Sequence, residues 1–156
     1  MKFIVDCMLG RLAKWLRIIG YDAVYFQEIT DRELVSIALK ENRFILTRDT
    51  LLVKRRNVKD YLLVEGDHFR DQLCFVVKRL KLDPYSEILT RCIRCNSLLE
   101  KIDKSDIKLM VPDHVFETQY LFKMCQTCKK VYWGATHRDE MKEELKAVFE
   151  IHDDDS

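Results

Sequence analysis

Residues 2–26 read KFIVDCMLGRLAKWLRIIGYDAVYF. The apolar run at 2–5 predicts a buried strand, and the apolar residues after it recur at helical spacing as far as Ile19. Gly20 follows this predicted helix where a C-terminal glycine is expected, and residues 23–26 predict a second strand. A strand, a helix and another strand in succession form the unit from which parallel sheets are built.

The same alternation continues to about residue 80. Thr30 and Glu33 are spaced as in a capping box, which predicts the start of the second helix. The later elements are predicted as strands at 44–47 and 61–64 and helices at 51–56 and 68–80. Asp67 is expected to cap the last of these helices. Short apolar strands alternating with helices predict an α/β fold, in which helices cover both faces of a parallel sheet.

A domain boundary is predicted at Asp83-Pro84, because proline disfavours helix at the residue before it. We therefore expect an α/β domain at 1–84, a small module with a C-terminal helix at 85–152, and an acidic tail at 153–156. Strand-like stretches of the module are predicted at 97–99, 107–111, 121–124 and 130–133.

Two Cys-x-x-Cys pairs, separated by 29 residues, stand in this module. Their members are Cys92, Cys95, Cys125 and Cys128. Two thiolates three positions apart can turn onto one metal ion, and two such pairs complete a tetrahedron. The four thiolates predict one structural Zn²⁺ with no open position for water. The alternative is a redox dithiol or a set of disulfides.

Three carboxylates are predicted at one edge of the sheet. Asp6 follows the first strand, Asp49 follows the third, and Asp31 opens the helix after the second. Ligand sites of open α/β sheets form at the carboxyl ends of the strands, so these side chains are expected to converge and bind Mg²⁺ or Mn²⁺. Such an ion stabilises charge in phosphate chemistry. Asp31 is equally well explained as a favourable charge at a helix start, and Asp67 is a candidate fourth acid.

Basic side chains accompany the predicted acidic edge. The candidates for contact with phosphate groups are Arg11, Lys14, Arg17 and Arg48. Residues 1–91 hold 17 Lys and Arg against 13 Asp and Glu, whereas residues 92–156 hold 10 against 13. This bias is compatible with nucleic acid binding to the first half, although a solvated helix face would also explain the basic residues.

Membrane and export signals are not expected. No apolar run approaches the roughly 20 residues that span a bilayer, and the N-terminus has no leader pattern. We therefore expect a cytoplasmic protein. Cys7 and Cys74 lie outside the paired pattern and are expected to be small buried residues.

Three segments together resemble one known family. The string 3–17 (FIVDCMLGRLAKWLR), the segment 46–49 (LTRD) and the cysteine pairs ending in 131–133 (VYW) resemble the PIN-like ribonuclease family named after the C-terminal domain of the Mut-seven exonuclease, with its fused zinc ribbon. The resemblance covers about 1–138. It implies a PIN-like α/β fold followed by a zinc ribbon, and cleavage of RNA that depends on Mg²⁺ or Mn²⁺. It also implies metal-binding roles for Asp6 and Asp49, and less directly for Asp31.

Other functions remain open at this stage. PIN nucleases use about four acids, and the fourth is not identified here, so a non-catalytic RNA-binding or ribosome-associated protein is the main alternative. A phosphotransfer or phosphatase domain would instead use Asp6 or Asp49 as an acceptor. A scaffold that binds other proteins and is held together by zinc is the third alternative.

Overall fold

The computed structural model describes residues 1–153, except for the side chains of residues 135, 136, 152 and 153. The predicted acidic tail therefore lies outside the described residues beyond residue 153. The first half contains β1 (Lys2–Val5), α1 (Gly10–Ile18), β2 (Asp22–Tyr25), α2 (Asp31–Glu41), β3 (Phe44–Thr47), β4 (Tyr61–Leu63) and α3 (Phe69–Leu80). Three-residue 3-10 helices lie at Cys7–Leu9 and Leu52–Lys54.

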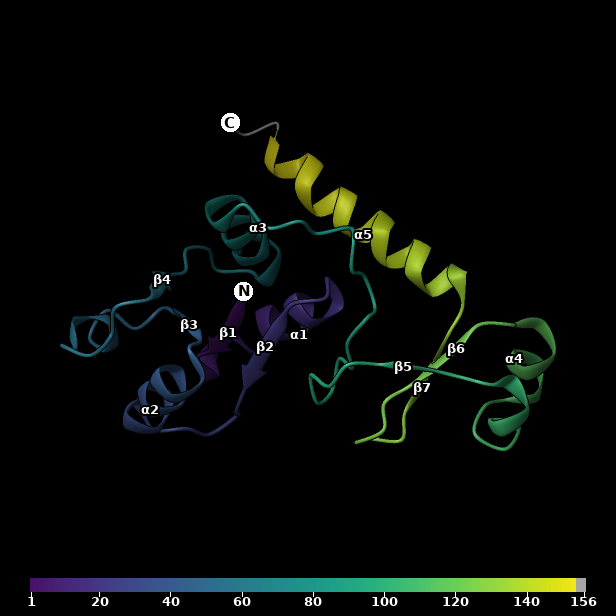
Figure 1. Ribbon diagram of the computed structural model, residues 1–156. Coiled ribbons are helices and arrows are strands. Elements are labelled where there is room, and N and C mark those ends of the chain that lie inside the picture. Colours follow the sequence, from purple (N-terminus) through teal and green to yellow (C-terminus); the bar gives the residue numbers. More distant parts are fainter. Residues whose placement is uncertain (154–156) are drawn as a thin grey trace.

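The strands of this half form one parallel sheet in the order β2-β1-β3-β4. Side chains of β1 alternate between its two faces, as the period of a strand requires. Phe3 and Val5 join the core formed with α1 and α3, whereas Ile4 packs with α2. Helices therefore cover both faces, which confirms the predicted α/β class (Figure 1).

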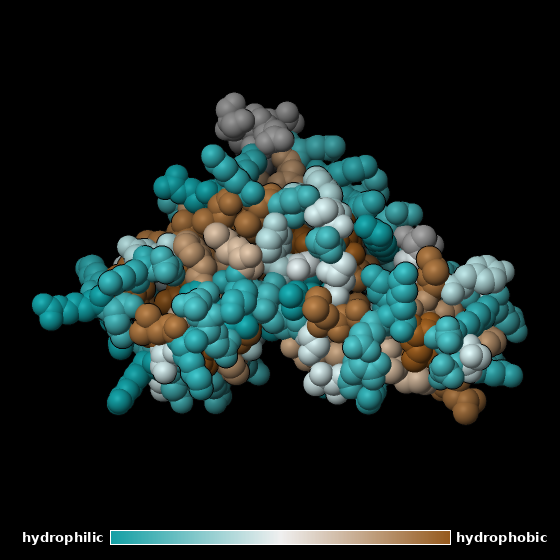
Figure 2. Space-filling model, in the orientation of Figure 1, coloured by the Kyte–Doolittle hydropathy of each residue, from teal (hydrophilic) through white to brown (hydrophobic). Residues whose placement is uncertain are grey.

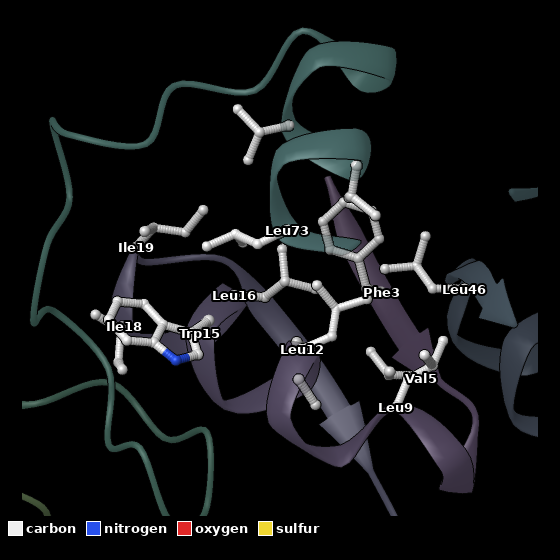
Figure 3. Close-up of a cluster of buried hydrophobic side chains, with 14 of the residues drawn as sticks. Phe3, Val5, Leu9, Leu12, Trp15, Leu16, Ile18, Ile19, Leu46 and Leu73 are labelled. Carbon is white, nitrogen blue, oxygen red and sulfur yellow. The ribbon is translucent and has the colours of Figure 1, made fainter. Parts of the chain in front are cut away.

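The larger core lies between the sheet and α1 (Figure 3). Leu12 and Leu16 of α1 are fully buried in it, together with Leu73 of α3. Two fully or almost fully buried residues from beyond the predicted domain boundary belong to the same core, Ile88 and Leu145. The second half of the chain therefore contributes side chains to the core of the first.

The second half contains β5 (Glu100–Ile102), the 3-10 helix η3 (Lys104–Asp106), α4 (Asp113–Thr118), β6 (Phe122–Met124), β7 (Val131–Trp133) and α5 (Ala135–Asp153). Its three strands form an antiparallel sheet in the order β5-β6-β7. We call the segment from Cys92 to Trp133 the ribbon. Helix α5 leaves the ribbon and returns to α3, so that it spans both halves (Figure 1).

Several predicted elements of the chain were wrong in detail. The stretch 107–111 is not a strand, because the Met110 N–H donates to the Ile107 carbonyl and turns the chain. Leu98 makes only an isolated bridge, and the strand begins two residues later. The predicted helix at 51–56 is a single 3-10 turn.

The predicted helix caps had different outcomes. Glu33 and Thr30 form the predicted capping box, in which each side chain accepts from the backbone N–H of the other. Asp67 does not cap α3, because His68 stands at that position and makes no capping bond. No helix among residues 1–153 is both long and apolar enough to cross a membrane.

Candidate active site and metal centre

Asp6 lies directly beyond β1 at the carboxyl edge of the parallel sheet. Only 5% of its surface is exposed, and its N–H donates to the Leu46 carbonyl, as if it continued the strand. Its Oδ2 accepts a hydrogen bond of 2.6 Å from the Thr47 hydroxyl, and its Oδ1 accepts one of 2.8 Å from the Cys7 N–H. Since a buried carboxylate without partners would be costly, these donors make its position tenable.

Asp49 is connected to Asp6 through Thr47. The Asp49 N–H donates to the Thr47 hydroxyl oxygen over 3.0 Å, and that same hydroxyl donates to Asp6. The Asp49 Oδ1 accepts from the N–H groups of Leu51 and Leu52, which fixes the carboxylate at the start of a 3-10 turn. Thr47 is fully buried. Sequence reasoning did not single it out, although its position at the end of a buried strand beside two acids was a usable signal.

Asp31 and Asp67 are more exposed than Asp6. Asp31 begins α2, where its Oδ2 lies 3.6 Å from Nη2 of Arg55. Asp67 has 93% of its side chain exposed and pairs with Arg48 over 3.4 Å. Among the described residues, the four cysteines are the group of three or more potential ligands that could hold a metal ion, and no such group includes an acid. The structure therefore links Asp6 with Asp49 but does not assemble a closed set of acidic ligands.

Three of the four predicted phosphate-binding residues are exposed. Lys14 and Arg11 lie on the outer side of α1, and the Arg11 guanidinium rests 4.2 Å above the centre of the Phe69 ring. Phe69 itself stacks on Trp15. Arg48 is exposed beside Asp49. These cations are accessible to a polyanion.

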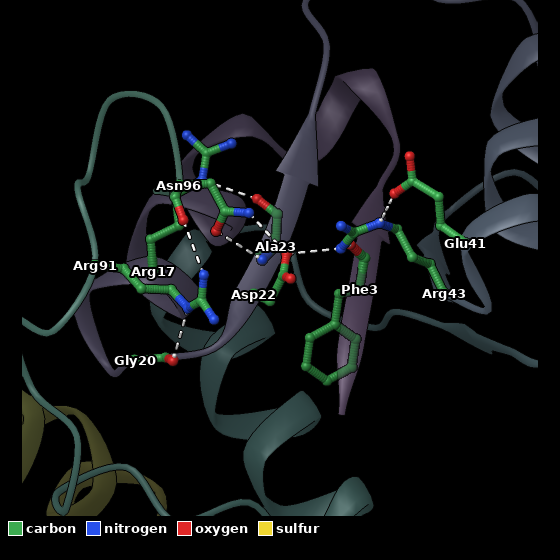
Figure 4. A network of polar contacts seen from close by, with 9 residues as sticks. All are labelled: Phe3, Arg17, Gly20, Asp22, Ala23, Glu41, Arg43, Arg91 and Asn96. Carbon is green, nitrogen blue, oxygen red and sulfur yellow. Dashed lines mark hydrogen bonds and ion pairs between the residues drawn. The ribbon is translucent and has the colours of Figure 1, made fainter. Parts of the chain in front are cut away.

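Arg17 has a different environment, and we correct its predicted role. It is 7% exposed. Its Nε donates to the Ala23 carbonyl over 2.8 Å, and its Nη1 donates to the carbonyls of Ile93 and Arg94. The side chain therefore joins α1 to the ribbon and to β2 and is buried away from solvent; Figure 4 shows it beside Ala23.

The four paired cysteines form a compact group. Their sulfur atoms all lie within 4.8 Å of one another, and the sulfurs of Cys95 and Cys125 are 3.4 Å apart. Sulfurs at about 2.3 Å from one tetrahedral zinc ion stand roughly 3.8 Å from each other. This donor set could therefore bind a structural metal such as zinc. No disulfide is formed by these residues, nor by Cys74, which is buried as predicted; Cys7 is exposed, contrary to prediction.

Each cysteine pair has the same backbone geometry. The N–H of Asn96 donates to the Cys92 carbonyl over 2.9 Å, and that of Lys129 donates to the Cys125 carbonyl over 2.8 Å. Both Asn96 and Lys129 are left-handed, with φ of 73° and 56°. Two matching tight turns of this kind aim all four sulfurs at one point. We call the turn 92–96 the first knuckle.

Hydrogen bonds also act on the thiols. Burial opposes ionisation of Cys95, but its hydrogen bonds with Ser97, and after them those with Cys125 and Cys128, outweigh it and lower the pKa of Cys95 to about 6. Burial likewise opposes ionisation of Cys92, and the hydroxyl of Tyr132, 3.3 Å away, is the main influence that lowers its pKa. Because a metal binds thiolates, these hydrogen bonds favour the required form at Cys92 and Cys95, whereas the pKa is raised at Cys125 by burial and at Cys128 by its hydrogen bond with Cys95.

The first knuckle is attached to the edge strand β2 (Figure 4). The Asn96 side chain accepts from the Ala23 N–H over 3.0 Å and donates to Asp22 over 2.7 Å. Arg91 donates to the Gly20 carbonyl. Burial raises the pKa of Asp22, but hydrogen bonds from Arg43 and Asn96 outweigh it, so that the pKa lies below its usual value. The ribbon and the α/β sheet therefore share a polar interface.

Comparison with known proteins gave one finding. The family model described as the Mut7-C RNAse domain matches residues 1–145. Every predicted site residue lies within the matched part of the chain. Neither the curated proteins nor the solved structures contain a match.

Proposed function

Because the chain belongs to the Mut7-C RNAse domain family, we propose that it is a ribonuclease that cleaves RNA at the carboxyl edge of its parallel sheet. The observation that carries this proposal is the buried Asp6 carboxylate, joined to Asp49 through the hydroxyl of Thr47. A carboxylate kept in this position, where open α/β sheets bind their ligands, suits a chemical role.

The acids of this edge fit a hard divalent cation. Mg²⁺ is usually held by one or two carboxylates, and waters and substrate phosphates complete its coordination. Asp6 and Asp49 would supply those carboxylates, and Asp31 a third from the start of α2. When bound, Mg²⁺ or Mn²⁺ supplies a Lewis acid that offsets negative charge on the phosphate.

The remaining residues orient the acids and the strand. Thr47 fixes the Asp6 carboxylate, and the N–H groups after Asp49 fix its own. Arg11, Lys14 and Arg48 would contact the RNA backbone, because charge-assisted hydrogen bonds suit phosphate oxygens. Phe69 supports the Arg11 guanidinium from below. A cytoplasmic location, and a protein or ribosomal partner, belong to the same proposal.

One observation favours a second candidate function. The acids do not form a closed group of three ligands among the described residues. A non-catalytic RNA-binding or ribosome-associated protein would need no such group. It would bind RNA through the same cations and leave it intact.

The experiment that tests the proposal is cleavage of end-labelled single-stranded RNA with added Mg²⁺ or Mn²⁺. Wild type is compared with Asp6→Asn and Asp49→Asn, and zinc content is measured in each. Asp60→Asn is the matched control, because Asp60 precedes β4 and lies at the opposite, amino edge of the sheet.

Loss of cleavage in the first two variants, with full activity in the control, supports the proposal. Equal cleavage by all four proteins would mean a contaminating nuclease and overturn it. RNA that is bound but never cut would favour the second candidate function.

A further inference from the structure

We propose that the ribbon carries its own binding site for single-stranded RNA, in which a base stacks on Trp133. This inference rests on the proposed RNA substrate and adds contacts outside the acidic edge. Trp133 ends β7 with 36% of its surface exposed, whereas Val131 and Tyr132 before it are buried. A large aromatic ring at this exposed position leaves a surface for a ligand.

Two cavities meet at this tryptophan. The first, of about 490 Å³, lies between α4, β7 and the beginning of α5. The second, of about 270 Å³, is bounded by Leu121, Lys123 and α5. Residues 132–134 line both. The first volume falls within the range of small-molecule binding pockets, so there is space for a base beside the ring.

The charges around the two cavities favour a polyanion. The cations that line them are Lys123, Lys130, Arg138 and Lys142. The acids that line them are Asp139 and Glu140, and Glu140 lies 3.8 Å from Nδ1 of His137. Residues 92–156 as a whole hold fewer cations than acids, 10 against 13. Cations therefore outnumber acids around Trp133, although acids outnumber cations in residues 92–156 as a whole.

An aromatic ring framed by cations is the recognition chemistry of single-stranded nucleic acid. Bases stack on aromatic side chains while Lys and Arg follow the phosphates. A base in a duplex is already stacked and paired, so an unpaired strand fits this site better. Brown apolar side chains show at the surface of the right-hand part of Figure 2, where the ribbon lies, between hydrophilic ones.

Tryptophan fluorescence tests the proposal directly. The chain has two tryptophans, and Trp15 is buried against Phe69, so Trp133 is the exposed reporter. A single-stranded RNA of about 12 nucleotides, within the usual footprint of such sites, is added to zinc-loaded Asp6→Asn protein, which is expected not to cut it. We expect quenching of the emission, and no quenching in the Trp133→Phe protein.

Affinity measurements on variants supply the controls. Trp133→Ala should weaken RNA binding by roughly 5- to 150-fold, the usual loss of one stacked base. Tyr120→Ala, which removes an exposed ring that lines neither cavity, should change it less than about twofold. Lys142→Ala should reduce the salt dependence of binding by about one phosphate contact, and Lys108→Ala should have a smaller effect.

The outcomes separate this inference from the proposed function. RNA that wild type cleaves without any change in Trp133 emission or in Trp133→Ala affinity overturns the inference alone. A response at Trp133 without cleavage supports the inference and overturns the proposed function. An emission that RNA leaves unchanged, with no cleavage, overturns both. If Trp133→Ala does not fold, the change in emission that RNA causes in the Asp6→Asn protein, compared with the Trp133→Phe protein, still tests the inference.

Discussion

Replacing Arg17 by methionine should lower the stability of the chain and leave its affinity for RNA unchanged. The guanidinium makes one buried hydrogen bond, to Ala23, and two partly buried ones, to Ile93 and Arg94. Hydrogen bonds from a charged group contribute about 1.5–3 kcal/mol each where water cannot replace them, and less where it can. Methionine relieves the burial of a charge, which offsets part of the loss. We expect a net loss of about 3 kcal/mol.

Urea denaturation followed by circular dichroism measures this loss, and zinc content is measured beside it. Arg11→Met is the matched control, because it makes the same change on the same helix at an exposed position. It should cost only about 0.5–1 kcal/mol, the value of its contact with the Phe69 ring, but it should weaken RNA binding. An Arg17→Met protein with unchanged stability and weakened RNA binding would refute the structural role assigned to Arg17.

Three further predictions concern single side chains. Thr47→Val keeps the shape of the residue but removes the donor to Asp6, so RNA cleavage should fall at least tenfold with zinc content unchanged; full cleavage would argue against a positioning role. Leu145→Ala should destabilise the chain by about 2–5 kcal/mol in urea, because Leu145 is fully buried in the core of the α/β half. Since the folded pKa of Asp22 is lowered, its contribution to stability is present above the unfolded pKa near 3.8 and disappears as pH falls below it. The difference in melting temperature between wild type and Asp22→Asn should therefore shrink below about pH 4, and a constant difference would contradict this.

The sheet was predictable because its signals are local. Each strand of the first half is a short apolar run, and each helix shows periodic apolar residues or a capping box, so no long-range information was needed. The stretch 107–111 was wrongly predicted as a strand because its sequence is mostly apolar. Its first and last residues, Ile107 and Val111, are indeed buried. Their burial comes from a turn and from α4, and spacing alone does not separate these from a strand.

The roles of individual polar residues were harder to predict. Arg17 and Lys14 stand three positions apart on one helix, and both read as surface cations. Only the position of the ribbon, fixed by residues more than 70 positions away, buries the first and leaves the second exposed. Thr47 presents the same difficulty, because its importance depends on the register that brings β3 beside β1.

The ribbon also completes the edge of the parallel sheet. β2 is an edge strand, and an edge residue normally leaves backbone groups without partners. Ala23 is fully buried, yet both of its backbone groups have partners: its N–H donates to Asn96, and its carbonyl accepts from Arg17. Asn96 is the last residue of the first knuckle and has a left-handed conformation. A metal bound to the cysteines would fix the knuckle, and with it the position of Asn96. The knuckle thus takes the place of a further strand, and a metal bound to its cysteines would stabilise the sheet that carries the acids.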